Sequence, residues 1–272
     1  MSEEFFNDNA ADINAMKMPC HTKRIGRELA MLYLFISEMH ESALKKYMEQ
    51  LFEETKSLKQ LFEDDKSLKQ LFEDDKSLEQ LFEETESLEQ LFEEAESREQ
   101  LFDIAKSLKQ LFEETESLEQ LFEEAKSLKQ LFEKAKALGL LFEEAKSHEK
   151  VFEEAAGIMH WQASRELRKG QEYAENLLDV WNLHQPEIDD KIRDLSANWE
   201  WDRLSSVDRQ IMRVAACEMM FVPDVPPVVS INEAVEIAND YSGENSGNFI
   251  NGVLNAIKNQ LSRPAREAVD HL

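Results

Sequence analysis

The chain has 272 residues, which is long enough for one or two domains with hydrophobic cores. It contains only 7 glycines and 6 prolines, which argues against a β-rich protein and favours an all-α fold. The formal net charge of −26 excludes a generally basic nucleic-acid-binding protein, so any RNA site must be a local basic patch.

Nothing in the chain indicates secretion or membrane insertion. Cys20 and Cys217 provide no disulfide framework and fit a reducing compartment. The first twenty residues carry four acidic side chains and lack the apolar run of a signal peptide. No apolar stretch approaches the roughly 20 residues that a membrane helix requires. We therefore expect a cytoplasmic protein that makes no membrane contact.

Residues 22–40 follow the pattern of an amphipathic helix that Thr22 can cap. One face is apolar, with residues at alternating spacings of four and three. These are Ile25, Leu29, Leu32, Ile36 and Met39. The opposite face is basic and carries Lys23, Arg24 and Arg27. A solvated surface and an RNA contact both fit such a basic face.

A ten-residue repeat follows this helix. Leu-Phe recurs every ten residues from Leu51 to Phe142, and Val151-Phe152 is the eleventh copy. Residues 51–150 hold 28 acidic and 14 basic side chains, no proline and a single glycine, Gly139. Most of these residue types favour helix, so we expect a long helical or partly disordered insertion.

The ten-residue period does not match the period of a straight helix. At 100° per residue the apolar stripe drifts by about 80° per copy, compared with roughly 20° for a heptad. One continuous helix would be about 160 Å long, so its two ends could not enter one compact domain. Either the repeat folds back, with a tip at the irregular copy around Arg98, Asp103 and Ile104, or its flanks do not pack together. Capping boxes such as Ser57–Gln60 and Ser87–Gln90 also fit one short helix per copy.

Five helical segments are expected after the repeat. Apolar periodicity predicts one over residues 160–183, a second that Pro186 opens, and a third that Ser205 caps. A capping box at Ser230–Glu233 predicts the fourth, and Ser246 begins the last.

Glu218 falls on the apolar stripe of the third segment, together with Ile211, Val214 and Val222. A buried carboxylate without partners is costly, so we expect hydrogen bonds to the turn around 225–230 or to an arginine such as Arg213. No second acid, histidine or nucleophile stands at a fixed spacing from Glu218, so a catalytic role is not favoured.

Three stretches resemble the NusB family. Residues 187–221 (EIDDKIRDLSANWEWDRLSSVDRQIMRVAACEMMF) are similar to its central helices. Residues 224–257 (DVPPVVSINEAVEIANDYSGENSGNFINGVLNAI) resemble its two C-terminal helices in order and spacing. Residues 22–35 (TKRIGRELAMLYLF) are similar to its arginine-rich opening helix. The resemblance covers residues 22–40 and about 165–260, and the repeat is not part of it.

The resemblance implies an all-α fold: a compact bundle of about seven helices in two subdomains, with the repeat inserted after the first helix. The expected parts are a disordered acidic tail (1–21), the first part of the helical domain (22–47), the repeat insertion (48–156), the remainder of the domain (157–262) and a tail (263–272).

The resemblance also implies a function. It implies binding of a boxA-type single-stranded RNA together with ribosomal protein NusE, within a transcription elongation complex that reads through terminators in ribosomal RNA operons. It implies no reaction and no cofactor. The six histidines do not cluster at metal-ligand spacing, so we expect neither a metal site nor a catalytic residue.

Six residues are candidates for RNA contact. Lys23, Arg24 and Arg27 can neutralise phosphates. The start of the last helix offers free N–H groups from Ser246 to Phe249 that suit an anion. Asn245 and Asn248 can read base edges there, and Phe249 can stack on a base or serve as a core residue.

Some departures from the family pattern affect this expectation. Asn239 and Asn248 stand where family members often carry a basic residue, which weakens the electrostatic attraction for RNA. Asn245 stands where an acidic residue is common, which removes a repulsive charge. Asn251-Gly252 is expected to serve close helix packing.

Two other functions remain open. One is a structural or scaffold protein that forms homo-oligomers through the acidic Leu-Phe repeat, because regularly spaced Leu and Phe side chains must be buried somewhere. The repeat can equally be a tandem expansion without a task of its own. An RNA-binding module of an RNA methyltransferase is disfavoured, because no Gly-rich cofactor segment or catalytic cysteine motif follows residue 260.

Overall fold

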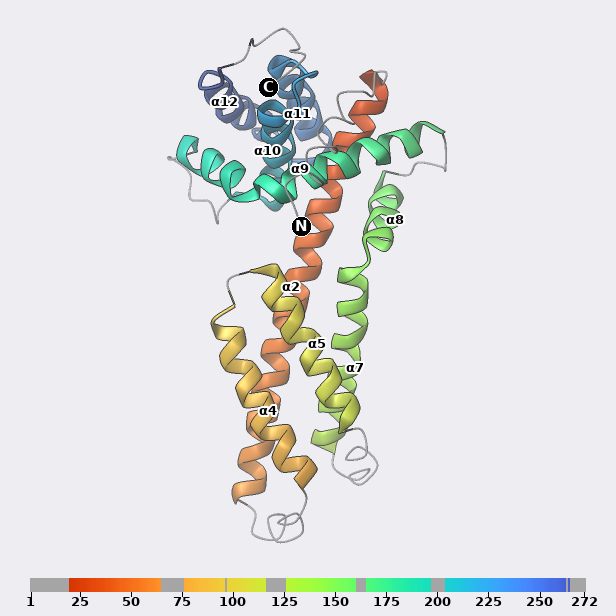
Figure 1. Ribbon diagram of the computed structural model, residues 1–272, viewed down its shortest axis with the longest axis vertical. Coiled ribbons are helices and arrows are strands. Elements are labelled where there is room, and N and C mark those ends of the chain that lie inside the picture. Colours follow the sequence, from red (N-terminus) through yellow and green to blue (C-terminus); the bar gives the residue numbers. More distant parts are fainter. Residues whose placement is uncertain are drawn as a thin grey trace, which may run out of the picture. The chain divides into compact units, whose positions relative to one another are not determined.

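The computed structural model describes residues 20–64, 76–95, 97–115, 126–159, 165–196, 204–262 and 264 (Figure 1). Within these ranges the chain forms nine helices and no strand, which confirms the all-α prediction. No helix there combines the length and apolar character needed to cross a membrane. The helices are α2 (Cys20–Asp64), α4 (Lys76–Glu93), α5 (Arg98–Glu114), α7 (Lys126–Lys146), α8 (His148–Ile158), α9 (Arg165–Leu195), α10 (Ser206–Phe221), α11 (Pro227–Tyr241) and α12 (Ser246–Lys258).

The predicted tails fall almost wholly outside the described ranges. Of residues 1–21, only the last two are described, and they form the start of α2. Of residues 263–272, only Pro264 is described.

The chain divides into two compact units. The flanking unit contains the described residues up to Ile36 and those from Phe152 onward, and the repeat unit is Ser37–Val151. Six of the described helices contribute to the flanking unit: α2, α8, α9, α10, α11 and α12. The rings of Tyr33 and Phe152 lie 4.8 Å apart in this unit, so the points where the chain leaves it and re-enters it are adjacent. A helical bundle built from both flanks, with a helical insertion, agrees with the predicted fold class.

Two glycines allow α2 and α9 to cross at very short range. A Cβ atom at Gly26 would lie 2.7 Å from Cδ1 of Tyr173 and 2.8 Å from the carbonyl oxygen of Gly170. A Cβ atom at Gly170 would in turn collide with the side chain of Ile25. Only glycine at both positions permits this approach, which brings Arg27 beside Tyr173.

The start of α2 is buried on more sides than its pattern predicted. Its apolar face is buried as expected, except that Met39 is 55% exposed. Arg27, predicted on the solvated face, is only 2% exposed. The reason is that α2 has neighbours on several sides, because it contacts α9 at Gly26 and α10 through Arg27 and Glu218. Side chains of α11 cover a third side.

Pro186 does not begin a new helix, contrary to the prediction. It lies inside α9, a helix of 31 residues. A proline removes the hydrogen bond to the carbonyl four residues earlier, here that of Asn182. Both residues are exposed, so water can solvate that carbonyl. Figure 1 shows that α9 changes direction along its length, as expected for a proline inside a helix.

Of the predicted starts of the last three helices, two are confirmed and one is wrong. Ser205 caps α10, its side chain accepting a hydrogen bond from the Asp208 backbone N–H at 3.0 Å. Ser246 begins α12 as predicted. The prediction that a capping box at Ser230 begins a helix is wrong. Helix α11 begins at Pro227, whose fixed φ and missing N–H suit a first helical position. Ser230 lies in the first turn and is buried.

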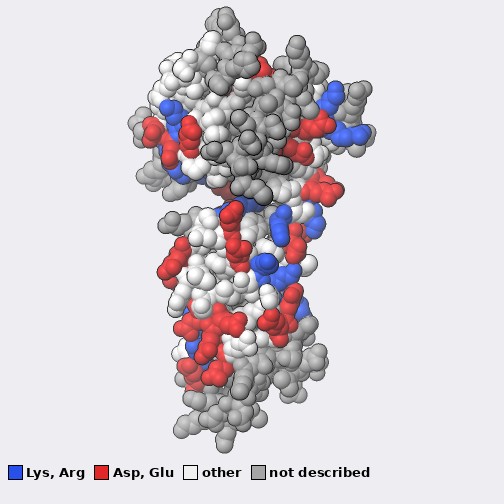
Figure 2. Space-filling model, viewed as in Figure 1, with Lys and Arg blue, Asp and Glu red and all other residues white. Residues whose placement is uncertain are grey.

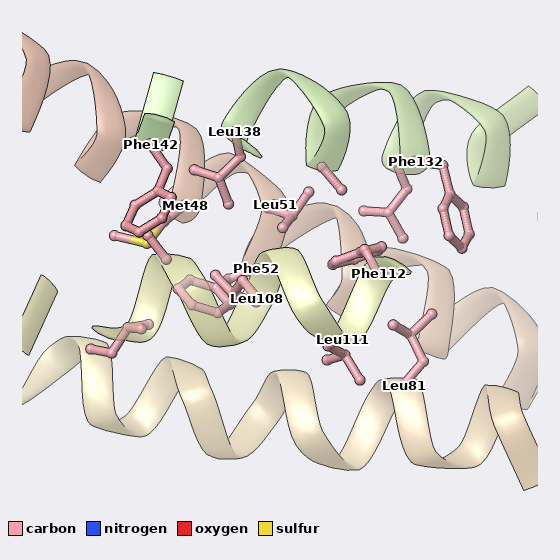
Figure 3. Packing of buried hydrophobic residues seen from close by; sticks show 14 of the residues in the cluster. Met48, Leu51, Phe52, Leu81, Leu108, Leu111, Phe112, Phe132, Leu138 and Phe142 are labelled. Carbon is pink, nitrogen blue, oxygen red and sulfur yellow. The ribbon is translucent and has the colours of Figure 1, made fainter. Parts of the chain in front are cut away.

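The repeat unit is a bundle of four helical segments, namely the second part of α2 with α4, α5 and α7. Figure 3 shows Leu, Phe and Met side chains from these segments pointing toward one another. In most described copies the first, second, fifth and eighth residues are buried, as in Leu101, Ala105 and Leu108. The repeat therefore folds back and buries its Leu and Phe residues within its own chain.

A threonine occupies the buried fifth position in three copies. The hydroxyl groups of Thr55, Thr85 and Thr115 each donate to the carbonyl four residues earlier, at 2.6 to 2.8 Å. Each hydroxyl is thus satisfied locally and needs no polar partner across the core. This explains why some copies can carry threonine and others alanine at this position without leaving an unsatisfied polar group in the core of the bundle.

Neighbouring helices of the repeat unit run antiparallel, as ring contacts and ion pairs show. The rings of Phe52 and Phe92 lie 5.4 Å apart, and Lys56 and Lys59 of α2 pair with Glu89 and Glu86 of α4, both at 2.8 Å. In each pair, a residue further along α2 meets one earlier in α4.

The pair α5 and α7 repeats this arrangement. The rings of Phe102 and Phe142 lie 5.7 Å apart, and those of Phe112 and Phe132 lie 5.4 Å apart. Lys109 pairs with Glu143 at 2.9 Å.

The chain between α4 and α5 turns close to the predicted tip. Arg98, which interrupts the leucine series, is the first residue of α5, and Ser97 caps that helix in a capping box with Gln100. Asp103 and Ile104 lie within α5, so that part of the prediction is wrong. Ser57 and Ser87 lie inside helices and start none.

Each helical segment holds about two copies before the chain turns. The stripe drift of about 80° per copy therefore never accumulates enough to carry the Leu-Phe face out of the core. Asp65 and Asp75 stand at the fifth position, which is otherwise Thr or Ala in the Leu-Phe copies, and both lie outside the described ranges, between α2 and α4.

Candidate nucleic-acid interface

Glu218 lies at the centre of a buried cluster of the flanking unit. It is 0% exposed, and both carboxylate oxygens accept from Nε of Arg27 at 2.9 Å. The Tyr173 hydroxyl donates to one oxygen, and the Ser230 hydroxyl donates to the other at 2.6 Å. The cluster joins α2, α9, α10 and α11. The predicted hydrogen bond to the 225–230 turn is confirmed at Ser230, but the arginine partner is Arg27.

Arg213, the arginine suggested for Glu218, pairs elsewhere. Its guanidinium donates to both carboxylate oxygens of Asp189, at 2.7 and 2.6 Å, and lies 5.7 Å from the ring of Trp181. This second ion pair fixes α10 against α9.

The contacts within this cluster favour the ionised form of Glu218 and the neutral form of Tyr173. Burial alone would raise the pKa of Glu218, but the Arg27 guanidinium and the hydrogen bonds it receives hold that pKa below its ordinary value. Burial opposes the charge of Arg27 as well, yet Glu218 raises the pKa of the guanidinium. Burial, followed by the charge of Glu218, raises the pKa of Tyr173 well above its ordinary value. An ionised acid and a neutral phenol at neutral pH suit a structural ion pair that positions the start of α2.

The two cations that precede this cluster on α2 are paired with carboxylates of α11 and its approach. Lys23 donates to Asp224 at 2.7 Å, and its ammonium lies 5.4 Å from the ring of Tyr173. Arg24 pairs with Asp240 at 2.8 Å and lies 3.6 Å from Glu233.

Arg24 also pairs with Glu28, which accepts a long hydrogen bond of 3.4 Å from the Tyr241 hydroxyl. Burial, followed by the charge of Glu28, raises the pKa of Tyr241 to about 12, so this phenol is neutral at physiological pH.

This surface is therefore not basic as it stands. Lys23, Arg24 and Arg27 face five carboxylates: Glu28, Glu218, Asp224, Glu233 and Asp240. A phosphate group must compete with carboxylates for Lys23 and Arg24. Asp240 is the weakest competitor, because 62% of its side chain is exposed and its charge is screened by solvent.

The start of α12 carries the remaining candidates. Asn245 and Asn248 are exposed, and Phe249 is half-buried, between the two alternatives predicted for it. The helix follows directly on the end of α11, where Asp240 and Tyr241 contact the first turns of α2. Arg24 thus lies toward the end of α11 from which the chain continues into α12, whereas Lys23 lies near the start of α11, beside Asp224.

The first turn of α12 is less open to an anion than predicted. The Ser246 N–H donates to Gly243 at 3.0 Å, and the Phe249 N–H donates to Asn245 at 3.3 Å. The Ser246 hydroxyl donates to the buried carboxylate of Asp208 at 3.0 Å, and Ser242 donates to the same carboxylate at 2.6 Å. A negative charge already lies behind this turn, which disfavours a second one.

The glycines of α12 have different roles from those expected. A Cβ at Gly247 would lie 3.0 Å from Oδ1 of Asn239, so this glycine serves the close packing of α11 and α12. Gly252, predicted to do so, is exposed, and a Cβ there would meet nothing within 4 Å.

Sequence reasoning missed several residues that build this site. Asp208 anchors Ser242 and Ser246, whose hydroxyls both donate to its carboxylate. Gly26 and Gly170 interrupt helical patterns, and an isolated glycine within a helix is a recognised sign of close packing. No local signal pairs Arg27 with Glu218, because 191 residues separate them.

Comparison with known proteins identifies relatives of the flanking unit. The model of the NusB family matches residues 128–259, beginning within the repeat and leaving out the first helix. The transcription antitermination protein NusB of Desulfotalea psychrophila is 46% identical over 91 residues, which cover 34% of this chain and 64% of that protein. NusB of Natranaerobius thermophilus is 41% identical over 103 residues, covering 38% and 74% of the two chains. NusB of Myxococcus xanthus is 37% identical over 108 residues, covering 38% and 77%.

A solved structure of T. maritima NusB is 31% identical, with a TM-score of 0.37, and the match covers 45% of this chain and 82% of that one. The chain thus spans about two thirds to three quarters of the length of the relatives named above. On the strength of the sequence identity with these relatives, the chain belongs to the NusB family.

Proposed function

We propose that this protein is a transcription antitermination factor that binds boxA-type single-stranded RNA together with ribosomal protein NusE and supports transcription of ribosomal RNA operons. The observation that carries the proposal is the 41% identity to a relative named transcription antitermination protein, of which the match covers 74%. Within this proposal the protein acts by binding, without cofactor or chemical reaction, in the cytoplasm and as part of the transcription elongation complex.

The surface proposed for RNA runs along α11, from Lys23 near its start to Arg24 and the first turn of α12 at its end. Lys23 and Arg24 supply the phosphate contacts, since both side chains retain some exposure. Asn245 and Asn248 are exposed and offer amide donors and acceptors to base edges. Phe249 is half-buried, and in this proposal the exposed part of its ring stacks on a base.

Arg27 takes a different part in this proposal. Direct contact with RNA would require its guanidinium to leave Glu218, and removing one partner from a buried pair costs about 3–5 kcal/mol. We assign Arg27 to holding the first turns of α2 in place, so that Lys23 and Arg24 are presented together.

The acidic surroundings set the expected strength of binding. Figure 2 shows red and blue side chains intermixed over the visible face, without a large uniformly basic area. With few phosphate contacts, RNA alone should bind weakly and with a shallow salt dependence. NusE then contributes by adding protein contacts to a complex in which the RNA is one component.

The test is a titration of labelled boxA-type RNA with the purified chain, with and without NusE, across a salt series. Binding that NusE strengthens, and that a scrambled RNA of equal length lacks, is the expected result. For single-stranded RNA, each lost phosphate contact reduces the slope of log K against log salt by about 0.7. Arg24→Gln should show this change. Phe249→Ala should weaken binding without changing the slope.

Arg193→Gln is a control of the same chemical type as Arg24→Gln, because Arg193 is an exposed arginine on α9. The absence of sequence-selective binding in the presence of NusE would refute the proposal.

The scaffold alternative depended on the Leu-Phe repeat. Most of those Leu and Phe side chains in the described copies lie within the core of the repeat unit. They are therefore not free to form the interface that the alternative required, and any self-association must use outward-facing residues of the repeat.

A further inference from the structure

One copy of the repeat departs from the others on its outward side. In the copy Leu131–Leu140, the seventh, ninth and tenth residues are Ala137, Gly139 and Leu140. The eight copies before it have serine, a charged residue and glutamine at these positions. Three polar residues have thus been replaced together by small or apolar ones. Random drift of a solvated face would not be expected to remove polarity at neighbouring positions only.

Leu140 is the most exposed large apolar residue in the described part of the chain, at 70%. It borders an open groove of about 660 Å³ between α5 and α7. The groove is lined by Phe112, Phe132, Ala135 and Gly139, and also by the charged residues Lys109, Glu113, Lys136 and Glu143. An apolar projection therefore stands beside a groove that offers both apolar and charged contacts.

Contacts within the chain do not account for Gly139. A Cβ there would lie 3.5 Å from the nearest carbon atoms of Lys109, which is an ordinary van der Waals distance. Alanine would fit and would favour the helix more than glycine does. Gly139 is buried, with the Lys109 side chain nearest to it, so a partner's side chain reaches it only if Lys109 moves aside.

We propose that this surface binds a second copy of the same chain, with the two α7 helices antiparallel about a two-fold axis between residues 139 and 140. In a symmetric dimer, one patch must be complementary to itself. Leu140 of each copy then enters the groove of its partner next to the partner's Gly139. The groove has room for this, because a leucine side chain fills only a fraction of its volume.

The charges on α7 agree with this axis. An antiparallel pairing centred between residues 139 and 140 places Lys136 opposite the partner's Glu143. It also places Glu133 opposite the partner's Lys146. All four side chains are exposed, and Glu143 already pairs with Lys109 of its own chain at 2.9 Å, so the partner's Lys136 joins that pair. Opposite charges therefore meet on both sides of the axis, whereas a parallel pairing in register would bring like charges together.

The test is sedimentation velocity of the full chain over a wide concentration range. A reversible dimer is expected for the natural sequence. Leu140→Gln restores the residue found at this position in the preceding copies and should weaken dimerisation at least tenfold. Its helix content by circular dichroism should not change, because Leu140 makes little contact with the core.

Two further variants make the test specific. Leu91→Gln changes another exposed leucine, on α4, and should leave the dimer intact. Glu133→Lys should weaken the dimer, and adding Lys146→Glu to it should restore the dimer, because the charges of this pair are then exchanged and the Lys109–Glu143 pair within each chain is kept. A natural chain that stays monomeric at every concentration, or a dimer that Leu140→Gln leaves unchanged, would overturn the proposal. Neither outcome bears on RNA binding, which lies in the flanking unit.

Discussion

Removal of the Glu218 carboxylate should destabilise the flanking unit severely. Glu218→Ala leaves the Arg27 guanidinium buried without its partner, and also leaves two buried hydroxyls, those of Tyr173 and Ser230, without an acceptor. Breaking a buried ion pair by removing one partner costs about 3–5 kcal/mol. Domains of this size have stabilities of about 5–15 kcal/mol, so the loss is a large part of the total.

Tryptophan fluorescence provides an assay that reports the flanking unit alone. All four tryptophans, at positions 161, 181, 199 and 201, lie outside the repeat unit Ser37–Val151. With a urea m value of about 2 kcal/mol/M, the fluorescence midpoint should fall by roughly 1.5–2.5 M. Far-UV circular dichroism in the same samples should show that the repeat unit unfolds as before.

Matched variants test the reasoning behind this number. Asp190→Ala breaks an exposed ion pair with Arg193 in α9 and should cost less than about 1 kcal/mol. Replacing both partners, as Arg27→Met with Glu218→Leu, should cost less than Glu218→Ala alone, because no buried charge is left unpaired. A loss from Glu218→Ala no larger than that from Asp190→Ala would refute the argument. If Glu218→Ala does not fold, Glu218→Gln gives a milder version of the same comparison.

The depressed pKa of Glu218 adds a pH dependence. Because the folded-state pKa lies below the unfolded value of about 4.3, the stabilisation is fully present above that pH. It is lost as the pH falls through the folded-state pKa. Glu218→Gln should therefore be less stable at neutral pH and should lose less stability between neutral pH and strong acid than the natural chain does.

Three other predictions follow from the described contacts. Gly26→Ala should lower the stability of the flanking unit by about 1–3 kcal/mol or more, since its methyl group would collide with α9, whereas Gly252→Ala should raise stability by up to about 1 kcal/mol; urea titrations check both. Asp240→Asn should strengthen RNA binding by about two- to fivefold by releasing Arg24, and Glu236→Gln should not; equal effects of the two would mean that only net charge matters. Burial raises the pKa of the Cys217 thiol, so in a variant without the other cysteine a thiol reagent should label the chain only after unfolding.

Local signals in the sequence predicted the helix starts that depend on a single side chain. Ser205 begins a helix as expected, because its side chain accepts a hydrogen bond from a free N–H group without help from the rest of the fold. Ser246 also begins a helix as predicted, but its hydroxyl donates to Asp208 and caps no N–H group. The chain length of the repeat left two alternatives, namely that the repeat folds back or that its flanks do not pack together, and the repeat folds back. The turn positions were harder, because every copy carries nearly the same side chains, and only substitutions such as Arg98 distinguish one copy from another.

The environment of the basic face of α2 could not be predicted in the same way. A helical pattern indicates which residues share a face, but not how many other helices cover it. Arg27 is buried because Gly26 and Gly170 bring α9 close and because Glu218, far away in the sequence, needs a cation. The partners of Lys23 and Arg24 are equally distant, on or near α11. These long-range carboxylates decide how much positive charge is available to RNA.

The contact between Tyr33 and Phe152 has a consequence for how this protein could change over time. For the flanking unit, everything between these two residues is one loop whose ends are held together. The entropy cost of closing a loop grows only with the logarithm of its length, by about 0.6 kcal/mol for each doubling. Gain or loss of copies that form a pair of helices therefore changes the loop-closure free energy of the flanking unit very little, provided the remaining helices still return to the same place. Replication errors can thus lengthen or shorten the repeat while selection continues to act on the surface formed by α2, α11 and α12.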